Sequence, residues 1–76
     1  MTTSREPDLL VRKLIEKLSD KDPRIRRNAT GALRMQGEKA TAAVPAILRL
    51  LNDEDPRVRR EAQQAIDELR PVPAHT

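Results

Sequence analysis

The chain contains the stretch LSDKDPRIR at residues 18–26 and a closely related stretch, LNDEDPRVR, at residues 51–59. The second follows the first by 33 residues, the difference between positions 51 and 18. In each stretch an Asp-Pro pair offers an N-cap oxygen acceptor and a Pro at the first helical position, where a missing N–H costs nothing. Each pair therefore predicts a helix start, at Pro23 and at Pro56.

The similarity extends outward from these two stretches. With the same shift, residues 14–33 align without a gap onto residues 47–66; nine of the 20 pairs are identical, and four more exchange one aliphatic residue for another. A period of this length is typical of repeat proteins whose units are single supersecondary motifs. We expect two units and no third, with repeat one at 8–37 and repeat two at 41–70.

Apolar spacing predicts two helices in each unit. Apolar residues recur every three or four positions along residues 10–18 and again along 44–51, as in helices with one buried face. Gly37 can end the second helix in a left-handed conformation, and Pro71 prevents further helix after the fourth. We predict an all-α fold, an α-solenoid fragment of two antiparallel helix hairpins, with helices at about 8–20, 23–36, 41–52 and 56–69.

The inward-facing residues of these helices form the predicted core. They are aliphatic, and their alanines allow neighbouring helices to approach closely: Leu10, Val11, Leu14, Ile15, Leu18, Ile25, Ala29, Ala32, Leu33, Val44, Ile47, Leu48, Leu51, Val58, Ala62, Ala65, Ile66 and Leu69. Because Pro45 would clash with the preceding turn, the third helix should begin near Val44 or kink there. Residues 7–70 form the single predicted domain, between a flexible segment at 1–6 and an extended tail at 71–76.

The composition of the 76 residues argues against a secreted, membrane-bound or disulfide-linked protein. There is no Cys and one His, His75, and no apolar run approaches the roughly 18 residues of a membrane span. We expect a cytoplasmic location. The net charge is only +3, and the absence of Phe, Trp and Tyr removes the rings that single-strand binders stack on bases.

Catalytic and metal-binding chemistry have little support in this sequence. No His or Cys occurs within the predicted helices, Ser4 and Ser19 have no nearby base, and no glycine-rich phosphate loop is present. The acidic pairs Asp20, Asp22 and Asp53, Asp55 lack the length, glycine and terminal Glu of a calcium loop. We expect neither an enzyme nor a cofactor, metal or small-molecule site.

The repeated stretch at 18–33 and 51–66 resembles the HEAT-repeat signature. Residues 43–48, AVPAIL, resemble the first-helix entry of the short HEAT-like repeats of phycobilisome-lyase-type proteins. The period of 33 residues is shorter than the roughly 40 to 47 typical of HEAT arrays, but the tetratricopeptide aromatics and the ankyrin Thr-Pro-Leu-His phrase are both missing. The chain is identified as two tandem short HEAT-like repeats.

This resemblance assigns structural and binding roles. In similar proteins, Asp and Arg at the spacing of Asp20 with Arg26, and of Asp53 with Arg59, form a ladder that bridges the hairpin turn and the neighbouring repeat. Asp22 and Asp55 are helix caps. The second helices of such proteins line a concave surface, which gives as partner-binding candidates Arg27, Thr30, Arg34, Arg60, Gln63 and Gln64. A merely solvated helix face is the alternative for these six residues.

A stack of two repeats leaves both ends unpaired, although about three repeats are normally needed for stability. We therefore expect self-association, most simply as a homodimer, with Leu9, Met35 and Leu50 as contact residues. The first functional hypothesis is a module that binds a partner protein or itself through helix faces and open ends. The alternatives are binding of nucleic-acid backbone by Arg27, Arg34 and Arg60, a bilin-lyase-like accessory role, or a segment of a longer or designed array.

Overall fold

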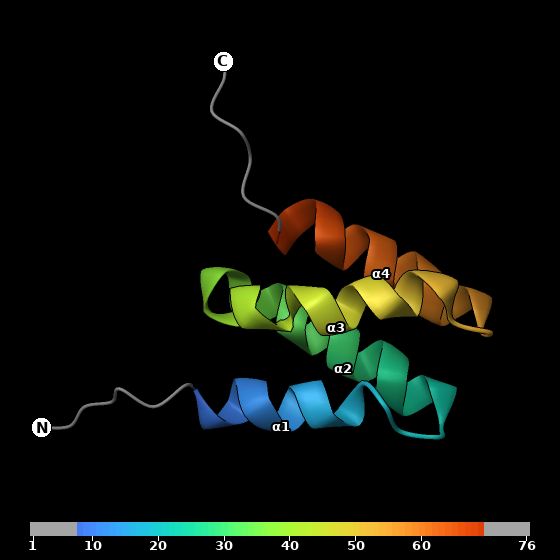
Figure 1. Ribbon diagram of the computed structural model, residues 1–76, viewed down its shortest axis with the longest axis horizontal. Coiled ribbons are helices and arrows are strands. Elements are labelled where there is room, and N and C mark those ends of the chain that lie inside the picture. The colour runs from blue at the N-terminus through green and yellow to red at the C-terminus, as the bar shows by residue number, and fades with distance from the viewer. Residues whose placement is uncertain (1–7, 70–76) are drawn as a thin grey trace, which may run out of the picture.

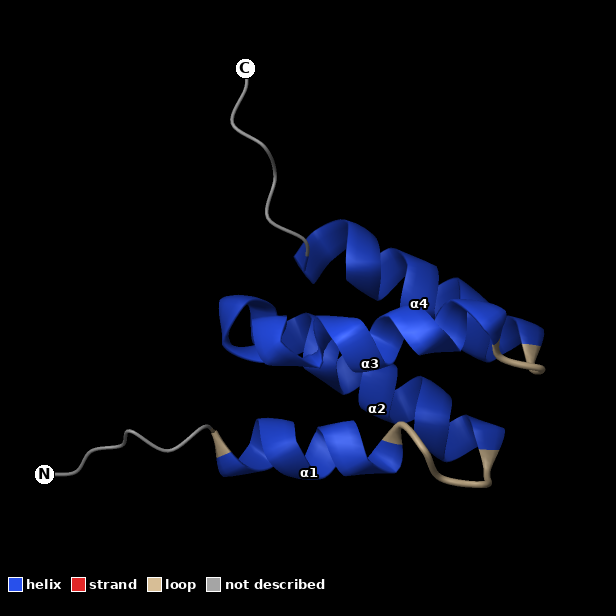
Figure 2. Ribbon diagram, viewed as in Figure 1, coloured by secondary structure: helices blue, strands red, loops and turns tan. Residues whose placement is uncertain are grey.

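The polypeptide folds into helices joined by short turns throughout residues 8–69, the part of the chain that the computed structural model describes. The α-helices are α1 (Leu9–Lys17), α2 (Pro23–Gln36), α3 (Val44–Arg49) and α4 (Pro56–Leu69), and two 3₁₀ segments are η1 (Gly37–Ala43) and η2 (Leu50–Asn52) (Figures 1 and 2). The predicted all-α class is confirmed, and residues 8–69 contain no strand. The predicted flexible segment 1–6 and tail 71–76 lie outside the described residues.

Asp side chains fix the starts of the two long helices, α2 and α4. Asp22 Oδ1 accepts a hydrogen bond from the backbone N–H of Arg24 at 2.8 Å, and Asp55 Oδ1 accepts one from that of Arg57 at 2.7 Å. Both helices begin at the Pro that follows the capping Asp. Their bounds are those that the Asp-Pro pairs, Gly37 and the apolar spacing predict.

The helix predicted at 8–20 is shorter than expected. It ends at Lys17, and the N–H groups of Leu18, Ser19 and Asp20 bind carbonyl groups three residues earlier, at 3.1 to 3.2 Å. This 3₁₀ pattern tightens the last turn and leads the chain into the hairpin.

The helix predicted at 41–52 is α-helical only at its centre. Residues Val44–Arg49 form α3, while η1 precedes it and η2 follows it. The α-helix begins at Val44, as Pro45 predicts, because a proline ring is compatible with the first turn of a helix but not with its interior. The prediction of a continuous α-helix over residues 41–52 is therefore wrong.

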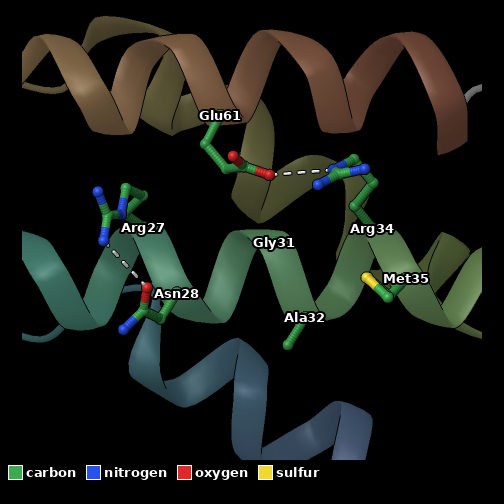
Figure 3. Close-up of a pocket in the computed structure, with 7 residues that line it drawn as sticks. All are labelled: Arg27, Asn28, Gly31, Ala32, Arg34, Met35 and Glu61. Carbon is green, nitrogen blue, oxygen red and sulfur yellow. Dashed lines mark hydrogen bonds and ion pairs between the residues drawn. The ribbon is translucent and has the colours of Figure 1, made fainter.

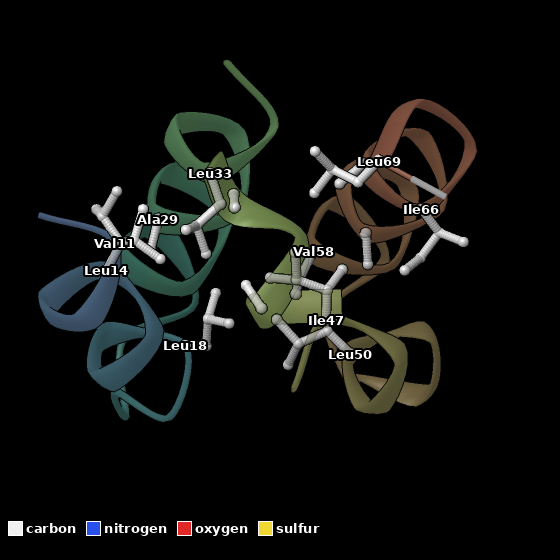
Figure 4. Packing of buried hydrophobic residues seen from close by; sticks show 14 residues of the cluster. Val11, Leu14, Leu18, Ala29, Leu33, Ile47, Leu50, Val58, Ile66 and Leu69 are labelled. Atoms are coloured by element: carbon white, nitrogen blue, oxygen red, sulfur yellow. The ribbon is translucent and has the colours of Figure 1, made fainter. Parts of the chain in front are cut away.

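The helices pack as two neighbouring pairs around a single core. Helix α2 lies against both α1 and α4, and α4 also lies against α3, so the α1–α2 pair sits beside the α3–α4 pair (Figures 1 and 4). The buried apolar residues are Val11, Leu14, Leu18, Ala29, Leu33, Ala40, Ala43, Ile47, Leu50, Val58, Ala62, Ala65, Ile66 and Leu69. The contact between α2 and α4 joins the two pairs.

Two leucines predicted in the core lie on the surface instead. Leu10 is 49% exposed and Leu48 is 44% exposed, while Ile25, Ala32 and Leu51 are half-buried. Ala32 and Leu51 still pack against the core. In the described residues, no helix has the length and apolar character needed to cross a membrane.

Candidate protein-binding surfaces

One buried arginine, Arg26, connects the turn after α1 to the turn before α4. Its Nε and Nη2 donate to the two carboxylate oxygens of Asp53, at 2.8 and 2.9 Å. Its Nη1 donates to the backbone carbonyl oxygens of Asp20 and Lys21, at 2.8 and 3.0 Å. The Arg26 and Asp53 side chains are only 10% and 7% exposed, so this pair holds the fold together and offers little to a partner.

The Asp53 carboxylate is held in its charged form. The hydrogen bond from Arg26 lowers the pKa of Asp53, and a backbone hydrogen bond from Asp55 adds to this effect against the opposing effect of burial. The N–H of Asp55 donates to Asp53 Oδ1 at 2.9 Å. Such a bidentate, charge-assisted pair has both strength and a fixed direction.

In the repeat alignment, Asp20 corresponds to Asp53, and Arg59 corresponds to Arg26. Among the described residues, neither Asp20 nor Arg59 forms the ion pair that its counterpart forms. Asp20 Oδ1 accepts from the backbone N–H of Asp22 at 2.8 Å, and Arg59 Nη1 donates to the backbone carbonyl oxygen of Asp53 at 2.7 Å. Within residues 8–69, neither side chain has an oppositely charged partner. Arg59 is exposed, whereas Arg26 is buried.

Two residues predicted to bind a partner are occupied within the fold. Arg34 Nε donates to Glu61 Oε2 at 3.0 Å (Figure 3). Arg34 Nη1 lies 3.6 Å from Glu68 Oε1, so two acids from α4 compensate its charge. Thr30 is fully buried, and its hydroxyl donates to the carbonyl oxygen of Arg26 at 2.8 Å. Thr30 cannot reach a partner because the α3–α4 pair covers it.

The other predicted partner-binding residues remain accessible to different degrees. Arg27 is half-buried and its Nη2 donates to Asn28 Oδ1 at 3.4 Å, while Arg60, Gln63 and Gln64 are exposed. Gln63 Nε2 donates to Asp67 Oδ1 at 3.1 Å. The expected basic strip is thus reduced to Arg27 and Arg60, because Glu61 and Glu68 compensate the charge of Arg34.

An apolar groove runs between α1 and α2, and we call it the α1–α2 groove. It encloses about 320 Å³ and is lined by Leu14, Lys17, Ile25, Asn28, Ala29 and Ala32. Leu10 lies on the same face of α1 as the lining residues Leu14 and Lys17, one helical turn before Leu14. Met35, 76% exposed, lines an adjoining hollow together with Asn28 and Ala32 (Figure 3).

The groove residues can be compared with the residues 33 positions later in the α3–α4 pair. Ile25 corresponds to Val58, Ala32 to Ala65 and Leu14 to Ile47, and these three α3–α4 residues have no exposed surface. Val58 and Ala65 belong to α4, against which α2 packs. The α1–α2 groove is therefore the surface that, in the α3–α4 pair, is filled by a neighbouring helix pair.

The opposite side of the molecule shows the converse pattern. Leu48, Leu51, Arg59 and Gln63 form what we call the α3–α4 far surface. Arg59 corresponds to the buried Arg26, Gln63 to the buried Thr30, and Leu51 to the buried Leu18, whereas Leu51 is half-buried and the other three far-surface residues are exposed. The far surface thus presents outward the positions that the α1–α2 pair uses to contact α3–α4.

The residues predicted for self-association divide accordingly. Met35 is exposed beside the groove, and Leu9 is exposed but lies about 100° around α1 from Leu10, away from the groove lining. Leu50 is only 8% exposed, so its assignment to a surface was wrong: it packs in the core close to α4.

Sequence reasoning missed Leu10, Ile25 and Leu48 as surface residues. Their apolar side chains and helical spacing are those of core positions, and only the number of stacked units decides whether they are covered. The signal that was available is the repeat alignment itself, because it shows which positions of the first and last units lack a neighbour. Within residues 8–69, no group of three or more acidic or histidine side chains is placed to hold a metal.

The arrangement described above defines a class, a helical repeat protein whose helix pairs stack through a shared core. A family model of HEAT repeats matches residues 10–74, so the chain belongs to the HEAT repeat family. HEAT repeats are generally non-catalytic and commonly serve as scaffolds for protein interactions. No curated protein and no solved structure matched the chain.

Proposed function

We propose that the chain is a non-catalytic protein-interaction module, built of two stacked short HEAT-like units, that binds protein at its α1–α2 groove and its α3–α4 far surface. The observation that carries this proposal is that positions buried where α1–α2 meets α3–α4 recur on the outside of the molecule. Leu10 is exposed and Ile25 is half-buried, although their counterparts Ala43 and Val58 are fully buried. Leu48 is a further exposed leucine, on the far surface. Exposed apolar residues that gather in a patch are typical of protein-binding sites, whereas single scattered surface leucines are not.

Nucleic-acid binding has weaker support. The Arg strip on α2 and α4 is interrupted by the compensated Arg34, and the chain offers no aromatic ring for base stacking. Arg27 and Arg60 remain, and two cations give only a small, salt-sensitive attraction to phosphates. No feature of residues 8–69 favours a bilin-lyase-like role.

The proposal is tested with two neighbouring leucines of α1. Leu10→Lys places a charge at the border of the groove, whereas Leu9→Lys places the same charge at a more exposed position away from it. Tagged wild-type and variant proteins are used to recover binding proteins from an extract of the source cells, with quantification by mass spectrometry. We expect Leu10→Lys and Leu48→Lys to reduce recovery at least about fivefold, equivalent to about 1 kcal/mol, and Leu9→Lys to have little effect.

A second set of samples separates this proposal from nucleic-acid binding. The double variant Arg27→Glu with Arg60→Glu reverses the remaining basic positions but leaves the groove and far surface intact. We expect it to recover the same proteins as the wild type, and we expect nuclease treatment of the extract to change nothing. Loss of the recovered proteins on nuclease treatment, or in the double variant alone, would contradict the proposal.

A further inference from the structure

The two open surfaces are complementary to each other in the same way as the two surfaces that meet inside the molecule. We propose that the partner of these surfaces is a second copy of this chain, stacked head to tail, with Arg59 of one copy bound to the Asp20 carboxylate of the next. This inference rests on the proposed function, because it names the protein that fills the α1–α2 groove and covers the α3–α4 far surface.

The intramolecular junction provides the template for this contact. There, Arg26 reaches across to Asp53, and α2 covers Val58 and Ala65 of α4. In the repeat alignment, Arg26 corresponds to Arg59, 33 residues later, and Asp53 corresponds to Asp20, 33 residues earlier. Arg59 of one copy and Asp20 of the next are therefore the equivalent pair at a junction between two copies. Arg59 lies on the far surface, and Asp20 lies in the turn between α1 and α2, the two helices that line the groove.

Both members of the proposed pair are already held as their buried counterparts are. Asp20 Oδ1 accepts from the N–H of Asp22, as Asp53 Oδ1 accepts from the N–H of Asp55. Arg59 Nη1 donates to the carbonyl oxygen of Asp53, as Arg26 Nη1 donates to that of Asp20. Within residues 8–69, the Nε and Nη2 of Arg59 have no acceptor, and these are the two atoms with which Arg26 binds its carboxylate.

The remaining positions are compatible with this docking but favour it less than the internal junction. At the junction between two copies, the positions of the Arg34–Glu61 ion pair are taken by Asp67 of one copy and Asn28 of the next. The Asn28 amide can donate a hydrogen bond to the Asp67 carboxylate. Glu54, which lies 3.9 Å from Arg26, corresponds to Lys21, whose positive charge would repel Arg59. We therefore expect an association in roughly the micromolar to millimolar range.

Such a contact joins two different surfaces of identical chains. A head-to-tail contact of this kind does not close at two copies, because each added copy presents a free groove or a free far surface for the next. The inference thus replaces the simple homodimer expected from the sequence with growth beyond a dimer as the protein concentration rises.

The test is sedimentation equilibrium of the full chain over a concentration series up to roughly 1 mM, the weakest affinity expected. For the wild type, the average mass should rise with concentration past that of a dimer. Asp20→Arg and Arg59→Asp should each remain monomeric alone, because like charges then meet at the junction. An equimolar mixture of the two variants should associate again, since Arg59 of the first meets the unaltered Asp20 of the second.

Two further variants keep the test independent of folding. Asp20→Asn retains the oxygen that accepts from Asp22 but removes the charge, and it should weaken association at least about tenfold while the circular dichroism melting curve stays close to that of the wild type. Arg49→Asp changes the net charge by the same amount as Arg59→Asp at an exposed position of α3, and it should associate as the wild type does.

The inference is overturned by a wild type that stays monomeric, by a mass that stops at a dimer, or by association that survives the charge reversals or does not return on mixing. A monomeric wild type that still recovers proteins through Leu10 and Leu48 would leave the proposed function standing with another partner. A wild type that neither associates with itself nor recovers proteins through Leu10 and Leu48 would contradict both proposals.

Discussion

Arg26 is the residue on which the junction between the two helix pairs depends most directly. One guanidinium satisfies two carbonyl oxygens at the end of the first hairpin turn and both oxygens of Asp53 in the second. In the described residues, no buried side-chain nitrogen or oxygen lacks a hydrogen-bond partner. Removal of the carboxylate would leave a buried cation with two unsatisfied donors, which is more costly than the pair itself is stabilising.

The two equivalent aspartates allow this cost to be measured. Asp53→Ala and Asp20→Ala each remove an oxygen that accepts from the backbone two residues later, but only Asp53→Ala also removes the partner of Arg26. We expect Asp53→Ala to lower the free energy of unfolding by about 3 kcal/mol or more, and Asp20→Ala by about 1 kcal/mol. Urea denaturation at low protein concentration measures both. Equal losses for the two variants would show that the pair adds no stability.

The same pair should make the fold sensitive to acid. The pKa of Asp53 is lowered in the folded state, chiefly by the hydrogen bond from Arg26, relative to about 3.9 in an unfolded chain. A depressed folded pKa contributes stability that is complete above the unfolded pKa and is lost as the pH falls through the folded pKa. The free energy of unfolding should therefore be nearly constant from about pH 7 to 5 and decline below about pH 4.

Substitution of the titrating group checks this assignment. In Asp53→Asn, the decline in the urea midpoint between pH 5 and pH 3 should be shallower than in the wild type, although Asp22 and Asp55, whose pKa values are lowered by hydrogen bonds from Arg24 and Arg57, still contribute to it. Asp20→Asn leaves the Arg26 pair intact and serves as the matched control. Identical pH profiles for Asp53→Asn and the wild type would contradict the assignment.

At the scale of single residues, the sequence predicts the helix caps well but predicts poorly which of the candidate binding residues are exposed. The capping roles of Asp22 and Asp55 follow from local hydrogen bonds within one turn. The burial of Thr30 depends instead on a helix pair that begins some 14 positions later, so its polar side chain and outward helical position were misleading. Glu61, which compensates Arg34, aligns with Asn28, and the repeat alignment therefore contained no sign of it.

At the scale of elements, two glycines have opposite roles. Gly37 ends α2 with φ of 62° and ψ of −136°, a conformation that is strained for any residue with a side chain. Its N–H donates to the carbonyl oxygen of Arg34. Gly31 lies inside α2, where a helix-forming residue is favoured and where an added Cβ would lie 3.2 Å from Glu61 Oε2. The Glu61 side chain is partly exposed and can move by the small distance needed.

Alanine substitution separates these two roles. Gly37→Ala should destabilise the protein by about 1 to 3 kcal/mol through backbone strain alone, because no atom lies within 4 Å of the added Cβ. Gly31→Ala should be neutral or stabilise it by up to about 1 kcal/mol. Thermal denaturation followed by circular dichroism measures both changes. A Gly37→Ala variant as stable as the wild type would contradict the role of this residue as the helix terminator.

The elements also show where sequence patterns are sufficient. The Asp-Pro pairs and Gly37 are strong local signals, and they predict the bounds of α2 and α4. The segment 41–52 has the apolar spacing of a helix, but Pro45 removes a donor and its ring excludes the preceding turn, so the chain enters and leaves α3 through 3₁₀ geometry. The exact balance of α and 3₁₀ turns depends on packing against α4, which spacing does not encode.

At the scale of the whole molecule, the main property is that a stack of two helix pairs has two uncovered sides. The α1–α2 groove retains the apolar lining that neighbouring pairs cover inside an array, and the far surface retains the arginine that would bind across the next junction. Repeat proteins gain much of their stability from such junctions, since each unit contacts only its neighbours. Under our proposal, association through these sides would supply both a function and additional stability.

The most direct measurement of this claim is a dilution series of the ¹⁵N-labelled chain, followed residue by residue in ¹H–¹⁵N correlation spectra. Concentration-dependent shifts should be largest for residues of the groove and the far surface, such as Ile25, Asn28, Leu48 and Arg59. They should be small at Leu9 and Arg49, exposed positions that belong to neither surface. Shifts confined to such positions, or none at any concentration, would contradict the conclusion that the uncovered sides of the stack are its binding surfaces.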